Sequence, residues 1–171
     1  DVVEAGSLEG VTTKVCIERA WPWQSNPYDQ GLLISLVNNS KNHAGVEGYF
    51  NKDEPDLAGT PHAQVLAAYN DIKALTTKPV AISLPYLYGT GVYPYPNGLQ
   101  YVDCADRFGI DQYLVPYSND LNAQVAAETT HVISVAGGKQ IDWVAQSFGW
   151  GDTFSPPYGR VPTVEEMTIY G

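Results

Sequence analysis

The sequence contains few cysteines and histidines, and this shortage argues against several kinds of site. Cys16 and Cys104 are the only cysteines; they lie far apart and match no metal-binding spacing. They could form a disulfide or remain as two buried free thiols. The three histidines, His43, His62 and His131, are scattered and form no HExxH-like pair. We therefore expect no metal site and no cofactor.

Basic residues are also scarce, since 9 Lys and Arg face 19 Asp and Glu. The formal charge is −10 and the sequence pI is about 4.5. An acidic surface disfavours binding to nucleic acid or to an anionic membrane. The sequence also lacks an apolar run long enough to span a bilayer. We expect neither a nucleic-acid partner nor a membrane partner.

Aromatic residues, in contrast, are abundant. They make up 12% of the chain, with 12 Tyr and 4 Trp, while only 16% of residues are charged. Flat rings with polar tips, together with Asn, Gln, Gly and Pro, suit an uncharged, hydroxyl-rich ligand better than a charged one. Many tyrosines could also simply pack loops together.

Short apolar segments alternate with amphipathic ones along the whole chain. This alternation predicts parallel strands joined by helices in a single α/β domain over residues 1–171. The predicted strands are 12–19, 45–52, 79–84, 110–115 and 141–147. The predicted helices are 29–42, 60–76 with Thr60 as N-cap, 99–107, 119–136 and one that starts at 162.

The loops that follow the strands are long and rich in Trp, Tyr, Asp and Asn, whereas the turns before the strands are short. A (β/α)8 TIM barrel distributes its loops in this way, with the chemistry at the carboxyl ends of its strands. No Gly-rich phosphate loop follows a strand, which disfavours a nucleotide-binding doubly wound sheet. About five of eight β/α units are visible, so we interpret the chain as part of a larger barrel.

The most informative stretch is 45–56, which reads GVEGYFNKDEPD. It begins as a strand and ends in polar groups that include Asp53 and Glu54. Pro55 stops the strand and biases Glu54 toward an extended backbone. Two acids are thus displayed where a buried strand leaves its sheet. The alternative is an acidic turn that caps the next helix.

Three segments in this order resemble the (β/α)8 glycoside hydrolases, particularly glycosidase-like barrels with an Asp-Glu-Pro motif. The resemblance covers roughly residues 10–171. The segments are 43–55, similar to a fourth barrel strand; 111–117, similar to a sixth; and 143–149 with 160–167, similar to a seventh strand and the start of its helix.

The resemblance implies that Glu54 is the general acid/base of a secreted or extracytoplasmic glycoside hydrolase. Asp53 then replaces an Asn that contacts the sugar 2-hydroxyl, and its charge should raise the pKa of Glu54 above about 4.3. The chain departs from the family at strand seven, where Gln146 stands in place of a nucleophilic Glu. Asp111 and Glu18 are the candidates for a second carboxylate.

The resemblance also implies an oligo- or polysaccharide substrate, bound by side chains in or beside the loops that follow the strands. The candidate substrate-binding residues are Trp21, Trp23, Tyr86, Tyr117, Gln146 and Trp150. Because the strand-seven Glu is absent, a noncatalytic carbohydrate-binding or structural barrel is the alternative. The sequence specifies neither the sugar, the linkage nor the oligomeric state.

Overall fold

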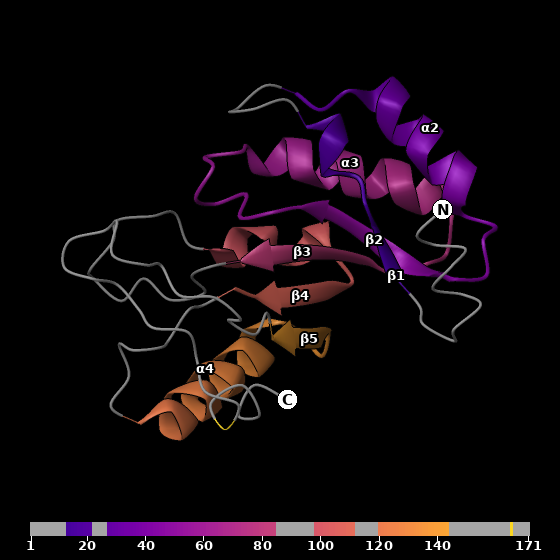
Figure 1. Ribbon diagram of the computed structural model, residues 1–171. Coiled ribbons are helices and arrows are strands. Elements are labelled where there is room, and N and C mark those ends of the chain that lie inside the picture. The colour runs from indigo at the N-terminus through magenta and orange to yellow at the C-terminus, as the bar shows by residue number, and fades with distance from the viewer. Residues whose placement is uncertain (1–12, 22–26, 85–97, 112–119, 144–164, 166–171) are drawn as a thin grey trace, which may run out of the picture.

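The protein is described here by a computed structural model that covers residues 13–21, 27–84, 98–111, 120–143 and 165 (Figure 1). Strands and helices alternate in the order β1, η1, α2, β2, α3, β3, η2, β4, α4 and β5, where η marks a 3₁₀ helix. The strands are β1 (Thr13–Cys16), β2 (Val46–Lys52), β3 (Val80–Leu84), β4 (Arg107–Ile110) and β5 (Gln140–Trp143). The helices are η1 (Glu18–Ala20), α2 (Gln30–Ser40), α3 (His62–Leu75), η2 (Gly98–Cys104) and α4 (Leu121–Val135).

The five strands form one sheet in chain order, and each neighbouring pair is parallel. The predicted alternation of parallel strands with helices is therefore confirmed. Figure 1 shows α2 and α3 lying together along one side of the sheet and α4 beside β5. No helix in the described ranges is both long enough and apolar enough to cross a bilayer.

Strand β3 is buried on both faces, because all five of its residues are buried. Val80, Ile82 and Leu84 belong to the main hydrophobic core. That core also takes in Val65, Ala68 and Ile72, which form a stripe along α3 at the three- and four-residue spacing of one helix face. The alternate residues of β3, Ala81 and Ser83, point to the other face of the sheet.

Several predicted element boundaries are wrong by a few residues. Predicted strand 12–19 ends at Cys16, and η1 replaces its last part. Predicted strand 110–115 begins earlier, because Arg107 already pairs with Ala81 of β3, and the strand ends at Ile110. The rest of that prediction, 112–115, lies outside the described residues, as do 144–147 of the last strand and the helix predicted from 162, of which only residue 165 is described.

Thr60 is not the N-cap of α3. The N-cap is Pro61, and it makes no side-chain capping bond. Thr60 instead closes the preceding turn: its N–H donates to the Pro55 carbonyl at 2.8 Å, and its own carbonyl accepts from the Tyr101 hydroxyl at 2.5 Å. Thr60 is 3% exposed, so its backbone groups need these partners inside the protein.

Cys16 and Cys104 are both free, so no disulfide joins them. Cys104 is buried, as expected for a structural thiol, whereas Cys16 is exposed.

The sheet is strongly curled. Lys14 of β1 places its ammonium 3.4 Å from the Glu47 carboxylate of β2 and 3.7 Å from the Asp142 carboxylate of β5. In a flat sheet with strands about 4.8 Å apart, β1 and β5 would be roughly 19 Å apart. One lysine and one aspartate side chain cannot bridge that distance, so the two outer strands must curve toward each other.

Candidate active site

Acidic residues gather where the strands end. Because the strands are parallel, their carboxyl ends lie at one edge of the sheet. Glu18 follows β1, Asp53 and Glu54 follow β2, and Asp111 follows β4. Ser83, near the end of β3, lies between the pair Asp53 and Glu54 on one side and Asp111 on the other. The predicted catalytic residues are therefore brought to the same edge.

The backbone at Glu54 is unusual, and the prediction that it would be extended is wrong. Its φ is +41°, which places it in the left-handed region that few non-glycine residues adopt. Two hydrogen bonds hold it there: its N–H donates to the Ser83 carbonyl at 3.0 Å, and its carbonyl accepts from the Ala58 N–H at 2.9 Å. Such strain costs about 1–3 kcal/mol and is often found at functional sites.

The Glu54 carboxyl group is difficult to ionise. Burial is the largest cause, followed by repulsion from Asp53, Asp111, Asp56 and Glu18; together they raise the pKa of Glu54 to about 7. The expected rise and the expected contribution of Asp53 are both present, although burial is the larger cause. A carboxyl group with this pKa is partly protonated at neutral pH and can donate or accept a proton there.

Asp53 shares this environment. Burial, and then the charges of Glu18 and Asp111, raise its pKa, while a hydrogen bond from Ser83 and the charge of Lys52 oppose the rise. The Lys52 ammonium pairs with the Glu18 carboxylate at 2.7 Å and is not among the groups that shift the pKa of Glu54.

Asp111 is 9% exposed and is anchored through its N–H, which donates to the Leu84 carbonyl at 3.2 Å. Its Oδ2 accepts a long hydrogen bond from the Ser83 hydroxyl at 3.5 Å, and its Oδ1 has no partner among the described residues. A hydroxyl has one hydrogen, so Ser83 can serve either Asp111 or Asp53 at a time. Asp111 Oδ1 is therefore a buried acceptor that no described residue satisfies.

Trp21 is the one predicted substrate-binding residue that the structure describes. It is 7% exposed, its indole N–H donates to Asn51 Oδ1 at 3.2 Å, and its ring lies 5.2 Å from that of Tyr28. In this position Trp21 supports the end of β2, and its contact with substrate stays a prediction. The other candidates, Trp23, Tyr86, Tyr117, Gln146 and Trp150, lie outside the described residues.

Sequence reasoning missed Ser83 and Asp56. Ser83 is a small polar residue inside an apolar strand, and only the pairing of β3 with its neighbours shows that it lies between two acids. Asp56 is 1% exposed, and burial raises its pKa to about 6 although hydrogen bonds from the N–H groups of Leu57 and Asp56 itself oppose the rise. The signal that could have identified it is the third acid in the run Asp53-Glu54-Pro55-Asp56.

Comparison with models of known protein families gives no match for this chain. A search of curated proteins gives no match either.

Proposed function

We propose that the five strands belong to a (β/α)8 barrel of the glycoside hydrolase type, with Glu54 as its general acid/base. Sequential parallel strands with right-handed connections put all helices on one face of a sheet. The contact between Lys14 and Asp142, on the outer strands β1 and β5, indicates a curvature of the kind that barrel closure requires and so supports this proposal. The single observation that carries the catalytic proposal is a partly buried Glu54, with a pKa of about 7, at the functional edge of such a sheet.

Each acid has a distinct part in the proposed reaction. Glu54 protonates the glycosidic oxygen of the leaving sugar. If Asp111 is the nucleophile, Glu54 then takes a proton from the attacking water, and if Asp111 is the base, Asp111 takes that proton instead. Asp111, with its unpartnered oxygen, is the candidate second carboxylate, either as nucleophile or as the base that activates water. Asp53 accepts a hydrogen bond from a sugar hydroxyl and helps to keep Glu54 protonated by like-charge repulsion.

The acidic edge also indicates a class of substrate. Four carboxyl groups act on Glu54, and Lys52 is already paired with Glu18. A sugar that carries carboxylate or sulfate groups would be repelled there. We therefore propose neutral oligo- or polysaccharides as the substrates.

The test is hydrolysis of neutral oligosaccharides by the wild type and by Glu54→Gln. We expect the variant to fold and bind sugar but to lose at least about 10²-fold in kcat/KM, since it lacks only the transferable proton. Glu47→Gln is the matched control: it makes the same change on the same strand, beside Lys14, and should retain activity. Natural linkages are needed because an activated aryl leaving group requires little acid assistance. Undiminished activity of Glu54→Gln would refute the assignment.

A noncatalytic carbohydrate-binding barrel is the second candidate, and Gln146 in place of the strand-seven Glu favours it. Asp111→Asn distinguishes the two. If Asp111 supplies the second carboxylate, this variant loses hydrolysis as severely as Glu54→Gln does. A wild type that binds oligosaccharides and cleaves none would favour the noncatalytic barrel.

A further inference from the structure

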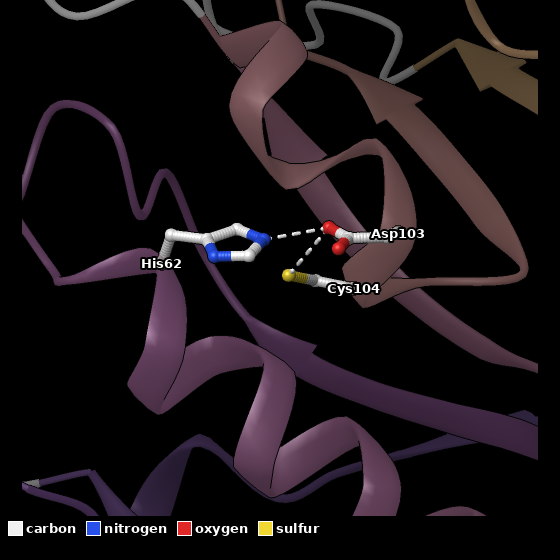
Figure 2. A group of neighbouring side chains, drawn as sticks. All are labelled: His62, Asp103 and Cys104. Carbon is white, nitrogen blue, oxygen red and sulfur yellow. Dashed lines mark hydrogen bonds and ion pairs between the residues drawn. The ribbon is translucent and has the colours of Figure 1, made fainter.

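Three ligating side chains meet where the start of α3 lies against the end of η2 (Figure 2). His62 Nε2 is 2.7 Å from Asp103 Oδ1, and Cys104 Sγ is 3.4 Å from the same oxygen. The three ligand atoms all lie within 4.8 Å of one another. His62 is 41 positions away from Asp103 in the sequence, so the fold alone brings them together.

The backbone around this group is held by contacts that do not use its ligand atoms. The Tyr101 hydroxyl, buried in the core, donates to the Thr60 carbonyl and lies 3.3 Å from the Pro55 carbonyl, the alternative acceptor for its one hydrogen, which ties η2 to the segment before α3. The Lys139 ammonium donates to the carbonyls of Val102 and, at 2.7 Å, Ala105, on either side of the two ligands from η2. These hydrogen bonds hold the backbone that carries the three side chains, which lowers the free-energy cost of ordering them around an ion.

We propose that His62, Asp103 and Cys104 form a binding site for a divalent transition-metal ion, with Zn²⁺ as the best-suited ion. Imidazole nitrogen, carboxylate oxygen and thiolate sulfur are the three ligand types of protein zinc, and a thiolate disfavours Mg²⁺ and Ca²⁺. At metal–ligand distances of about 2.0–2.3 Å, tetrahedral ligands lie about 3.3–3.8 Å apart. The separations of 2.7 and 3.4 Å, with every pair within 4.8 Å, span this range.

The exposure of the three residues favours an accessible site. His62 and Asp103 have 35% and 59% of their side-chain surface exposed, whereas Cys104 is fully buried beneath them. An ion can thus enter from solvent and keep a water molecule as its fourth ligand, the arrangement of zinc sites with three protein ligands. Without an ion, the Cys104 thiol donates its hydrogen to Asp103. A bound cation takes the place of that hydrogen, and the proton passes to solvent.

Co²⁺ as a spectroscopic probe for Zn²⁺ tests the proposal, because a cysteine ligand gives sulfur-to-cobalt charge-transfer absorption. The reduced protein, freed of metal with a chelator, should develop this band at one Co²⁺ per chain, and Zn²⁺ should displace it. Cys104→Ser should abolish the band. Ion binding to carboxylates elsewhere does not produce this band, so the acidic strand ends do not interfere.

Matched variants separate the site from other groups. Asp103→Asn and His62→Gln, both at partly exposed positions, should fold normally by circular dichroism. Each should weaken Zn²⁺ binding by at least about 10-fold, the smallest loss typical even of residues that only support a ligand. Cys16→Ser and His43→Gln are the controls: they remove an exposed free thiol and a histidine at another position, and they should leave the band unchanged.

The outcomes are decisive in both directions. A wild type without the band, a band lost in Cys16→Ser but kept in Cys104→Ser, or full Zn²⁺ affinity in Asp103→Asn and His62→Gln would overturn the proposal. Glu54→Gln should bind Co²⁺ as the wild type does, so the test of this metal site is independent of the proposed glycosidase chemistry.

Discussion

At the scale of single residues, the main property of the candidate site is the raised pKa of Glu54. The pKa values of Asp53 and Asp56 are raised as well, so three acids in one short run resist ionisation. Burial is the first cause for each. Neighbouring charges add to the shift for Asp53 and Glu54, and this second contribution can be changed without altering the burial of Glu54.

Asp53→Asn should lower the pKa of Glu54, because it removes the largest of the like-charge repulsions on Glu54 and leaves burial in place. Side-chain ¹³C NMR titration of Glu54 in the wild type and the variant measures this directly, without a substrate. We expect the wild-type midpoint near pH 7 and the variant midpoint at lower pH. Equal midpoints would show that Asp53 does not influence Glu54.

At the scale of elements, two glycines test the packing. A Cβ at Gly48 of β2 would lie 2.6 Å from the Pro79 carbonyl oxygen, a backbone atom next to β3. Gly48→Ala should therefore lower the free energy of unfolding by about 1–3 kcal/mol, as overpacking does. A Cβ at Gly31, in the first turn of α2, would meet only an Asp29 oxygen at 3.4 Å.

Gly31→Ala is the matched control and should raise the free energy of unfolding by up to about 1 kcal/mol, because alanine favours helix more than glycine does. Urea unfolding of both variants provides the comparison. If Gly48→Ala were as stable as the wild type, the close approach of β2 to the segment before β3 would be wrong.

At the scale of the whole molecule, the raised carboxyl pKa values predict how stability depends on pH. Glu54 and Asp56 have folded-state pKa values of about 7 and about 6, above their ordinary values of 4.5 and 3.8. Their favourable contribution to the free energy of unfolding is complete below the ordinary pKa values and is lost as pH rises through the folded-state pKa values.

Asp103 and Asp106 have the opposite effect on how stability depends on pH. Burial works against their ionisation, but hydrogen bonds, from His62 to Asp103 and from the Val80 N–H and Lys73 to Asp106, lower their pKa values overall.

The contribution of Asp103 and Asp106 is therefore lost only as pH falls below about 3.8. We expect the free energy of unfolding to be about 2–4 kcal/mol lower near pH 8 than near pH 4.5, after allowing for solvent screening of a partly exposed site. Urea unfolding across this range checks the expectation. The double variant Glu54→Gln, Asp56→Asn should lose most of the difference, and a wild type most stable near pH 8 would contradict it.

Local pattern was enough to predict the alternating architecture and the position of the candidate acids. A short, β-branched apolar run such as Val80–Leu84 favours a buried strand, and Pro55 limits how far β2 can extend. The sequence also predicted that the pKa of Glu54 would be raised, because adjacent acids repel each other whatever the rest of the fold. Boundaries were less accurate, because the start of β4 at Arg107 is decided by its partner Ala81 rather than by its own residues.

Only the tertiary structure could decide which distant residues meet. Ser83 becomes part of the site because β3 lies between β2 and β4, and Lys14 reaches Asp142 because the sheet curls. His62 is isolated in the sequence, because its neighbour Asp103 lies 41 positions away in η2. Contacts of this kind depend on the path of the chain between elements, and that path is set by packing across the whole core rather than by any one segment.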